Sequence, residues 1–273
     1  MLELRKKSEE VHIGNIVVGG EQPWVLIAGP CALENENMAL QTAETLAQLT
    51  DKLGIPYIFK GSYDKANRLS IESERGVGFE QGMHILSKIR EQFGVPILTD
   101  VHDIADAEAA ACYVDCLQIP AFLCRQTDLV VAAARSGKPI NIKKGQFLAP
   151  EDMIHIAEKA KASRAVGIML TERGACFGYQ NLVLDFRSIP IMATTGCPIV
   201  VDVSHSQQKP GAGKGYSGGS REFIPHTAVA GLALGADAIY IEAHPEPEKA
   251  ISDRETQWPL NEIEQLLEFL KGF

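Results

Sequence analysis

Eight short apolar runs, each followed by a segment with helical periodicity, recur along this 273-residue chain. The runs are continuously apolar instead of alternating, which is typical of strands buried on both faces of a parallel sheet. Eight strand–helix units in about 250 residues predict an α/β fold, a (β/α)8 TIM barrel, with a doubly wound open sheet as the alternative. The expected strands are 25–28, 57–59, 96–99, 116–119, 139–142, 166–170, 199–203 and 238–241, and the expected helices are 38–53, 79–93, 104–112, 126–136, 151–161, 186–194, 223–234 and 260–271.

Two further features concern domain organisation. Segment 11–20 carries Gly14-Asn15 between apolar residues, a pattern that predicts a short N-terminal β-hairpin. No Pro/Ser-rich linker or low-complexity segment divides the sequence, so we expect a single barrel domain over residues 1–273.

Composition narrows the class of protein. No apolar run approaches the roughly 20 residues that span a bilayer, and the charged segment 1–10 cannot be a signal peptide. We therefore expect a cytoplasmic protein with its six cysteines reduced. The net charge of −9 and the lack of a basic stripe argue against nucleic acid as the partner, and the lack of a long apolar run argues against a membrane.

Polar side chains follow every predicted strand. The richest stretch, Lys60-Gly-Ser-Tyr-Asp-Lys-Ala-Asn-Arg68, places three cations, a carboxylate and an amide after the second strand. The loops that enter the strands, such as Leu53-Gly-Ile-Pro56, resemble simple turns. Because the strand exits of a parallel barrel share one face, these side chains are expected to form one site.

Cations are one part of that expected site. Lysine and arginine gathered on one face of an acidic protein indicate one or two substrates that carry several phosphate or carboxylate groups. The alternative for each cation is a simple ion pair with Asp64, Asp100 or Glu172. The set consists of Lys60, Lys65, Arg68, Arg125, Lys143, Lys144 and Arg173.

A second part is a possible metal site. Cys31 follows the first strand, His205 the seventh and Glu242 the eighth, and Asp253 comes eleven residues later. Strands one, seven and eight are neighbours in a closed barrel, and this mixed donor set suits a divalent transition ion. The alternatives are a buried structural cysteine and an unrelated histidine. The glycine-rich stretch 211–219 lacks a P-loop pattern, so we interpret the 205–221 loop as mobile and a possible lid.

At these residues the chain resembles the 3-deoxy-D-manno-octulosonate-8-phosphate synthase family. The Lys65-Ala-Asn-Arg68 motif discriminates, because the sister heptulosonate-phosphate synthases carry Lys-Pro-Arg-Thr there. The resemblance runs in order from about residue 11 to the end. The other matching segments are Leu117-Gln-Ile-Pro-Ala-Phe-Leu-Cys-Arg-Gln-Thr-Asp128, Asn141-Ile-Lys-Lys-Gly-Gln-Phe147, Glu172-Arg-Gly-Ala-Cys-Phe-Gly-Tyr179 and Ile241-Glu-Ala-His-Pro-Glu-Pro-Glu248.

The resemblance implies a transferase that condenses phosphoenolpyruvate with arabinose 5-phosphate in lipopolysaccharide precursor biosynthesis. Its catalytic residues would be Lys60, Lys65, Asn67, Asp100 and His205. Lys60 and Lys65 would bind phosphoenolpyruvate, whose phosphate Lys143, Arg173, Gln118 and the Ala121 main chain would hold. Asn67 and Asp100 would contact the sugar hydroxyls, and Arg68 would hold the sugar phosphate with Arg125 of a neighbouring subunit in a homotetramer.

The family has metal-dependent and metal-free branches, and the latter has Asn where this chain has Cys31. The resemblance therefore implies one divalent ion (zinc, iron, manganese or similar) held by Cys31, His205, Glu242 and Asp253. Two positions depart from the family: Leu69 stands where many members have Ser, and Gly145 replaces a common Pro. The alternatives are the sister heptulosonate-phosphate synthase, which uses erythrose 4-phosphate, and a non-catalytic sensor of phosphorylated ligands.

Overall fold

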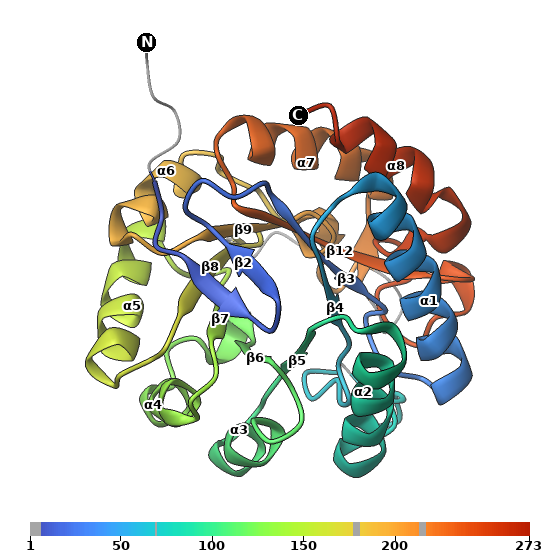
Figure 1. Ribbon diagram of the computed structural model, residues 1–273, viewed down its shortest axis with the longest axis horizontal. Coiled ribbons are helices and arrows are strands. Elements are labelled where there is room, and N and C mark those ends of the chain that lie inside the picture. The colour runs from blue at the N-terminus through green and yellow to red at the C-terminus, as the bar shows by residue number, and fades with distance from the viewer. Residues whose placement is uncertain (1–6, 69, 177–180, 213–216) are drawn as a thin grey trace.

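The computed structural model describes residues 7–68, 70–176, 181–212 and 217–273. Eight parallel strands close into a barrel, because β12 pairs with both β3 and β9 (Figure 1). This closure confirms the (β/α)8 barrel over the open sheet. The barrel strands are β3 (Val25–Gly29), β4 (Tyr57–Lys60), β5 (Ile97–Asp100), β6 (Cys116–Ile119), β7 (Ile140–Lys143), β8 (Ile168–Glu172), β9 (Ile199–Asp202) and β12 (Ala238–His244).

The eight predicted helices surround these strands (Figure 1). Local signals set their ends: Asn35 accepts the Met38 amide at the start of the first helix, and Gly54 ends it in the left-handed conformation. The helices are α1 (Glu36–Leu53), α2 (Phe79–Phe93), α3 (Ile104–Ala110), α4 (Thr127–Arg135), α5 (Met153–Ala162), α6 (Ser188–Met192), α7 (Ile224–Ala233) and α8 (Ile263–Leu270).

Several predicted boundaries were wrong by a few residues. Helix α6 is shorter than 186–194 because it tightens into the 3-10 turn Ala193–Thr195, and α8 follows another such turn at Leu260–Glu262. Most of the strands continue beyond their predicted ends. Lys60, Asp100 and Lys143 are therefore the last residues of β4, β5 and β7, and they do not lie in the following loops.

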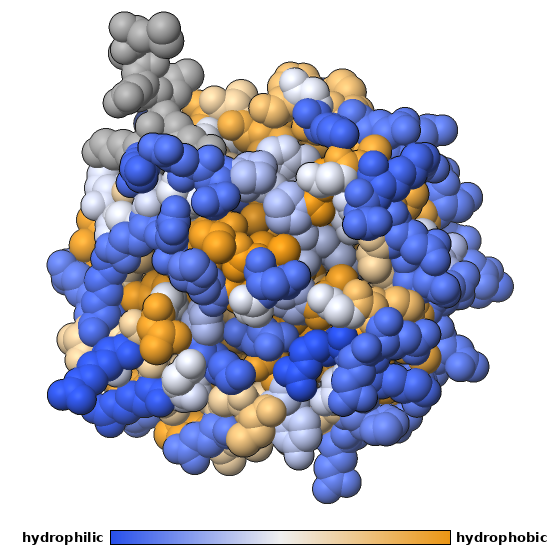
Figure 2. Space-filling view, in the orientation of Figure 1, coloured by the Kyte–Doolittle hydropathy of each residue, from blue (hydrophilic) through white to orange (hydrophobic). Residues whose placement is uncertain are grey.

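The predicted hairpin is also confirmed. Strands β1 (Val11–Ile13) and β2 (Ile16–Val18) pair around Gly14, whose φ of 56° suits the turn. Val11, Ile13 and Val18 are buried and form one apolar cluster with residues of the barrel interior. The hairpin lies across one end of the barrel, where a group of apolar residues is framed by hydrophilic ones (Figures 1 and 2). It closes the end opposite the strand exits.

Three short strands were not predicted. β13 (Trp258–Pro259) extends the sheet beside β12, and β10 (Gln208–Lys209) pairs with β11 (Gly218–Gly219) at the two ends of the glycine-rich loop. Strands of two residues leave no hydrophobic periodicity in a sequence.

Glycine has a specific packing role at the end of β3. A Cβ atom on Gly29 would lie 2.0 Å from the carbonyl oxygen of Lys60, the last residue of the neighbouring strand β4. The two strands can therefore approach only because residue 29 lacks a side chain. This contact fixes the backbone position of Lys60.

Candidate active site

A cavity of about 250 Å³ opens at the carboxyl ends of the strands. Most of the predicted catalytic and substrate-binding residues line it: Lys60, Lys65, Asn67, Asp100, Gln118, Ala121, Lys143, Arg173 and His205. They come from six different strand ends, so the barrel brings together residues far apart in sequence. Asp64, His102, Phe122 and Gln146 complete parts of the wall.

Lys60 and Asp100 form a buried polar chain on one side of the cavity. Lys60 Nζ donates to Ser62 Oγ at 2.5 Å and lies 3.3 Å from Asp100 Oδ1, while Ser62 donates to the same carboxylate. Burial raises the pKa of Asp100, but the Lys60 charge and the His102 hydrogen bond outweigh it and hold the pKa well below its ordinary value. Asp100 is therefore ionised, and the chain is a fixed array of charges.

Lys65 extends this chain toward the metal ligands. Its Nζ lies 3.3 Å from Ser62 Oγ. Burial lowers the pKa of Lys65, but the carboxylates of Glu242, Asp100 and Asp253 raise it above its ordinary value. The side chain remains a cation and suits a substrate carboxylate.

Lys143 lies deeper. Its Nζ donates to the fully buried Asp202 at 2.5 Å, lies 3.3 Å from His205 Nδ1 and sits 4.1 Å from the centre of the Tyr240 ring. Burial lowers the pKa of Lys143, and the neighbouring Lys60 acts in the same direction. An added anion would therefore be attracted to a desolvated cation.

Two buried donors in the cavity that Lys143 lines remain unsatisfied. Arg173 Nη1 and Gln118 Nε2 have no hydrogen-bond partner among the residues that the structure describes, although both side chains line the cavity. Leaving such groups buried without a partner costs about 1–3 kcal/mol each. Together with Lys143 they form a site that an anionic ligand with several oxygen atoms would complete.

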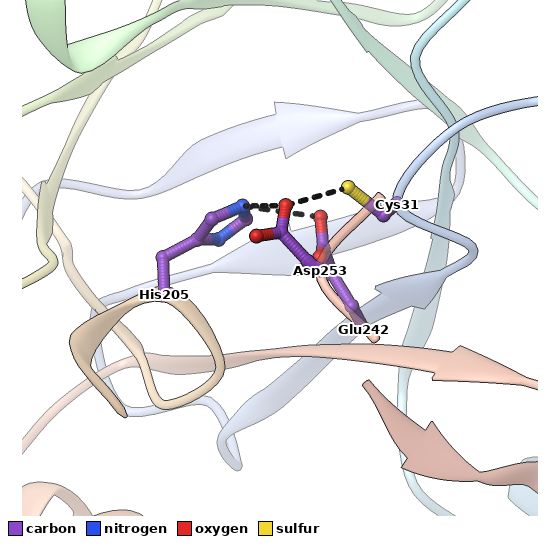
Figure 3. Close-up of side chains that lie close together, drawn as sticks. All are labelled: Cys31, His205, Glu242 and Asp253. Carbon is purple, nitrogen blue, oxygen red and sulfur yellow. Dashed lines mark hydrogen bonds and ion pairs between the residues drawn. The ribbon is translucent and has the colours of Figure 1, made fainter. Parts of the chain in front are cut away.

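The four predicted metal ligands do converge. One donor atom from each of Cys31, His205, Glu242 and Asp253 lies within 4.8 Å of the others, and Figure 3 shows the side chains facing a common point. Cys31 Sγ is 3.0 Å from Asp253 Oδ2, and His205 Nε2 is 3.3 Å from Glu242 Oε1. Metal–ligand bonds of about 2.0–2.3 Å place donors roughly 3–4.5 Å apart, so the cluster fits one divalent ion.

The surroundings of the cluster also fit a metal. His205 Nδ1 lies 2.7 Å from Asp202 Oδ2, an arrangement that directs Nε2 toward the other three ligands. Glu242 Oε2 is buried without a hydrogen-bond partner in the described part of the chain. Burial, followed by the charge of Glu242, raises the pKa of the Cys31 thiol, so a bound cation is what would favour its thiolate form.

Three predicted cations lie elsewhere. Arg68 does not line the cavity: it donates to Ser252 Oγ at 3.0 Å, to the Glu74 carbonyl at 2.8 Å and to the Ile251 carbonyl. Lys144 is buried against Glu172, with 3.6 Å between Nζ and Oε1, so the simple ion-pair reading holds there. Arg125 is exposed, outside the cavity, and Leu69 lies outside the described residues.

The sequence analysis did not name the residues that link pairs of site residues by hydrogen bonds. Asp202 joins Lys143 to His205, Ser62 joins Lys60 to Asp100, and Gln208 joins Arg173 to Asp253. Asp202 stood at a predicted strand exit, which was a usable signal. Ser62 stood within the Lys60–Arg68 stretch, two residues from Lys60, but its bond to Asp100 spans 38 residues. Gln208 carried no signal, because both of its partners are distant in sequence.

Comparison with known proteins identifies the family. The model of the DAHP synthetase I family matches residues 3–273. The chain belongs to this family. Among the curated members, 2-dehydro-3-deoxyphosphooctonate aldolase of Acidithiobacillus ferrooxidans is 54% identical over 93% of this chain and 90% of its own length. The proteins of the same name from Legionella pneumophila (53%, covering 93% of both chains) and Geotalea uraniireducens (52%, covering 97% of both) are similar.

The family model and the names of these relatives thus confirm the resemblance that the sequence motifs indicated. None of the helices in the described ranges combines the length and the apolar character needed to cross a bilayer.

Proposed function

We propose that this family member condenses phosphoenolpyruvate with arabinose 5-phosphate and water, giving 3-deoxy-D-manno-octulosonate 8-phosphate and phosphate for lipopolysaccharide precursor biosynthesis. The names of the relatives support this reaction. The observation that carries it is the set of buried donors that line the cavity. Arg173 Nη1 and Gln118 Nε2 find no partner among the described residues and line the same cavity as Lys143, an arrangement that suits a phosphate group.

The cavity residues account for the binding of two mutually repelling anions. Lys143, Arg173 and Gln118 would hold the phosphate of phosphoenolpyruvate with the Ala121 main chain, while Lys65 would pair with its carboxylate. Neutralising these charges lets the sugar phosphate approach, and orienting the two reactants can contribute roughly 7–11 kcal/mol to catalysis.

The chemistry follows from this placement. Carbon three of phosphoenolpyruvate attacks the sugar aldehyde, water adds to carbon two, and the tetrahedral intermediate loses phosphate by C–O cleavage. Lys60 would polarise phosphoenolpyruvate, and its contacts with Ser62 and Asp100 fix its ammonium group. Asn67 and Asp100 line the same wall and would contact the sugar hydroxyls.

A divalent ion belongs to this proposal. Cys31, His205, Glu242 and Asp253 would hold it, and when bound it would supply Lewis-acid polarisation of the aldehyde or activation of the water. Asp202 fixes the tautomer of His205 for that task.

Arg68 and Arg125 would complete the sugar-phosphate subsite. Arg68 bonds to Ile251 and Ser252 beside the loop that carries Asp253, and it would have to exchange these contacts for the sugar phosphate to take this role. Arg125 is exposed and would reach the site of a neighbouring subunit in a homotetramer.

The decisive experiment is phosphate release from phosphoenolpyruvate with two sugar phosphates. We expect turnover with arabinose 5-phosphate and at least tenfold less with erythrose 4-phosphate. The reverse preference would favour the sister heptulosonate-phosphate synthase. Binding of both substrates without phosphate release would indicate a sensor of phosphorylated ligands.

Metal removal tests the cofactor. Treatment with a chelator should abolish phosphate release, and adding back a divalent ion should restore it. The Cys31→Ala variant should bind the ion more weakly by elemental analysis. Undiminished turnover of protein shown to be metal-free would refute the proposed role of the ion.

A further inference from the structure

Gln208 connects the anion-binding part of the cavity to the metal ligands. It begins β10, and each end of its side-chain amide is occupied. Arg173 Nη2 donates to Gln208 Oε1 at 2.7 Å, and Gln208 Nε2 donates to Asp253 Oδ1. One neutral side chain therefore links a cavity cation to a carboxylate of the metal cluster.

The two oxygens of Asp253 have different surroundings. Oδ2 faces the metal cluster, 3.0 Å from Cys31 Sγ and 3.9 Å from His205 Nε2, whereas Oδ1 takes the Gln208 hydrogen bond. The Asp253 backbone has a φ of 51°, which is uncommon for a non-glycine residue. The Asp253 carboxylate is oriented by its hydrogen bonds, and the one from Gln208 is among them.

The Arg173 guanidinium is available at its other end. Nη1 is buried without a hydrogen-bond partner in the described ranges, while Nη2 is engaged by Gln208. An anion bound at Nη1 would fix the guanidinium plane, because both groups belong to one rigid fork. Fixing that plane also fixes the Gln208 amide and, through it, Asp253.

We propose that Gln208 is a positioning residue that couples anion binding at Arg173 to metal binding at Asp253, so that an anion in the cavity raises the affinity for a divalent ion. This inference rests on the proposed metal site. Ordering the ligand in advance removes part of the entropy cost of metal binding. By linkage, the bound ion raises the affinity for the anion by the same factor.

A second residue besides Gln208 also bonds to the Asp253 carboxylate. The proposed coupling can therefore be removed without removing metal binding itself. Ser252 Oγ donates to Asp253 Oδ2 at 3.1 Å, and Asp253 also accepts from the main-chain amides of Thr256 and Gln257 through its own carbonyl. A Gln208→Leu variant should therefore retain the four ligands and bind metal. It should lose the response of metal binding to the anion.

The test titrates Co²⁺ into chelator-stripped protein, with and without saturating inorganic phosphate. The thiolate-to-cobalt absorption band of Cys31 reports occupancy. In the native protein, phosphate should tighten Co²⁺ binding by about fivefold or more, a typical coupling between linked sites. In Gln208→Leu the effect should fall to less than about twofold, since only through-space attraction between anion and metal remains.

Gln207→Leu is the matched control, because Gln207 bonds to Thr227 Oγ1 and Ser206 and does not line the cavity. It should keep the native coupling. Equal coupling in native protein and Gln208→Leu, or no phosphate effect in native protein that shows the band, would overturn the inference alone. A missing band would overturn it together with the metal site.

Discussion

At the residue scale, the cavity is a set of charges held by buried neighbours. Asp202 is the centre of one such group, because its carboxylate meets Lys143, the His205 ring and the His205 main-chain amide. Asp100 is the centre of the other, next to Lys60 and His102. Removing either carboxylate would leave a cation buried without its partner.

Asp202→Asn tests whether Asp202 orients His205, the proposed metal ligand. The amide keeps the shape but cannot fix the His205 tautomer as a carboxylate does, so metal affinity should fall by roughly 10–100-fold. Chelator competition measures this change. Asp185→Asn, which alters an exposed ion pair with Arg187, is the control and should leave affinity unchanged. Native affinity in Asp202→Asn would contradict the assigned role.

The ionised Asp100 should make the stability of the protein depend on pH. Its pKa is lower in the folded protein than in the unfolded chain, so its contribution to the free energy of unfolding is present above its unfolded value of about 3.9 and is lost as pH falls below it. Urea unfolding between pH 7 and pH 3 should show a weaker acid dependence for Asp100→Asn. The exposed Asp51→Asn control should follow the native protein. Identical curves for all three would count against the Asp100 contribution.

At the scale of elements, the eight strand–helix units were predictable because both-face burial produces continuous apolar runs. The convergence of the proposed metal ligands Cys31, His205 and Glu242 was predictable too, since a closed barrel makes β3, β9 and β12 neighbours. The contacts of Arg68 with Ile251 and Ser252 were not, because a flexible side chain chooses among partners that only the fold brings near. Gln208 was missed for the same physical reason.

The close contact between β3 and β4 at Gly29 should control the position of Lys60 in the cavity. In Gly29→Ala, the new methyl group would overlap the Lys60 carbonyl oxygen, so β3 and β4 must separate and Lys60 must move. We expect kcat to fall by about 100-fold, as misplacing a catalytic group by about 1 Å can cause. Gly54→Ala is the control: it has a positive φ but no described atom within 4 Å of the added carbon. It should lose only stability, and equal kcat losses would contradict the prediction.

At the scale of the whole molecule, the rim of the cavity carries side chains suited to a second copy. Phe122 lines the cavity and is 53% exposed, and Phe147 is 58% exposed. Arg125 lies close to Phe122 in sequence and is also exposed. These features agree with the proposed contribution of Arg125 to a neighbouring site.

Complementation tests this contribution. Arg125→Ala should raise the KM for arabinose 5-phosphate at least tenfold, and Lys60→Met should be inactive. Co-expressed chains that mix at random would give about one quarter of sites with both residues intact if Arg125 acts from a neighbour. Recovered phosphate release in mixed oligomers would support the arrangement. Mixed oligomers no more active than the sum of the two parents would refute it.

The hairpin at the opposite end of the barrel has a consequence for kinetics. With Val11, Ile13 and Val18 sealing that end, ligands enter and leave through the strand-exit mouth. Lys143 and Arg173 are buried, whereas Asn67 is exposed. The reactant that binds to Lys143 and Arg173 must therefore enter first, because the other reactant would block its path. We expect an ordered sequence, with phosphoenolpyruvate first. Competition between the octulosonate product and each substrate would reveal it.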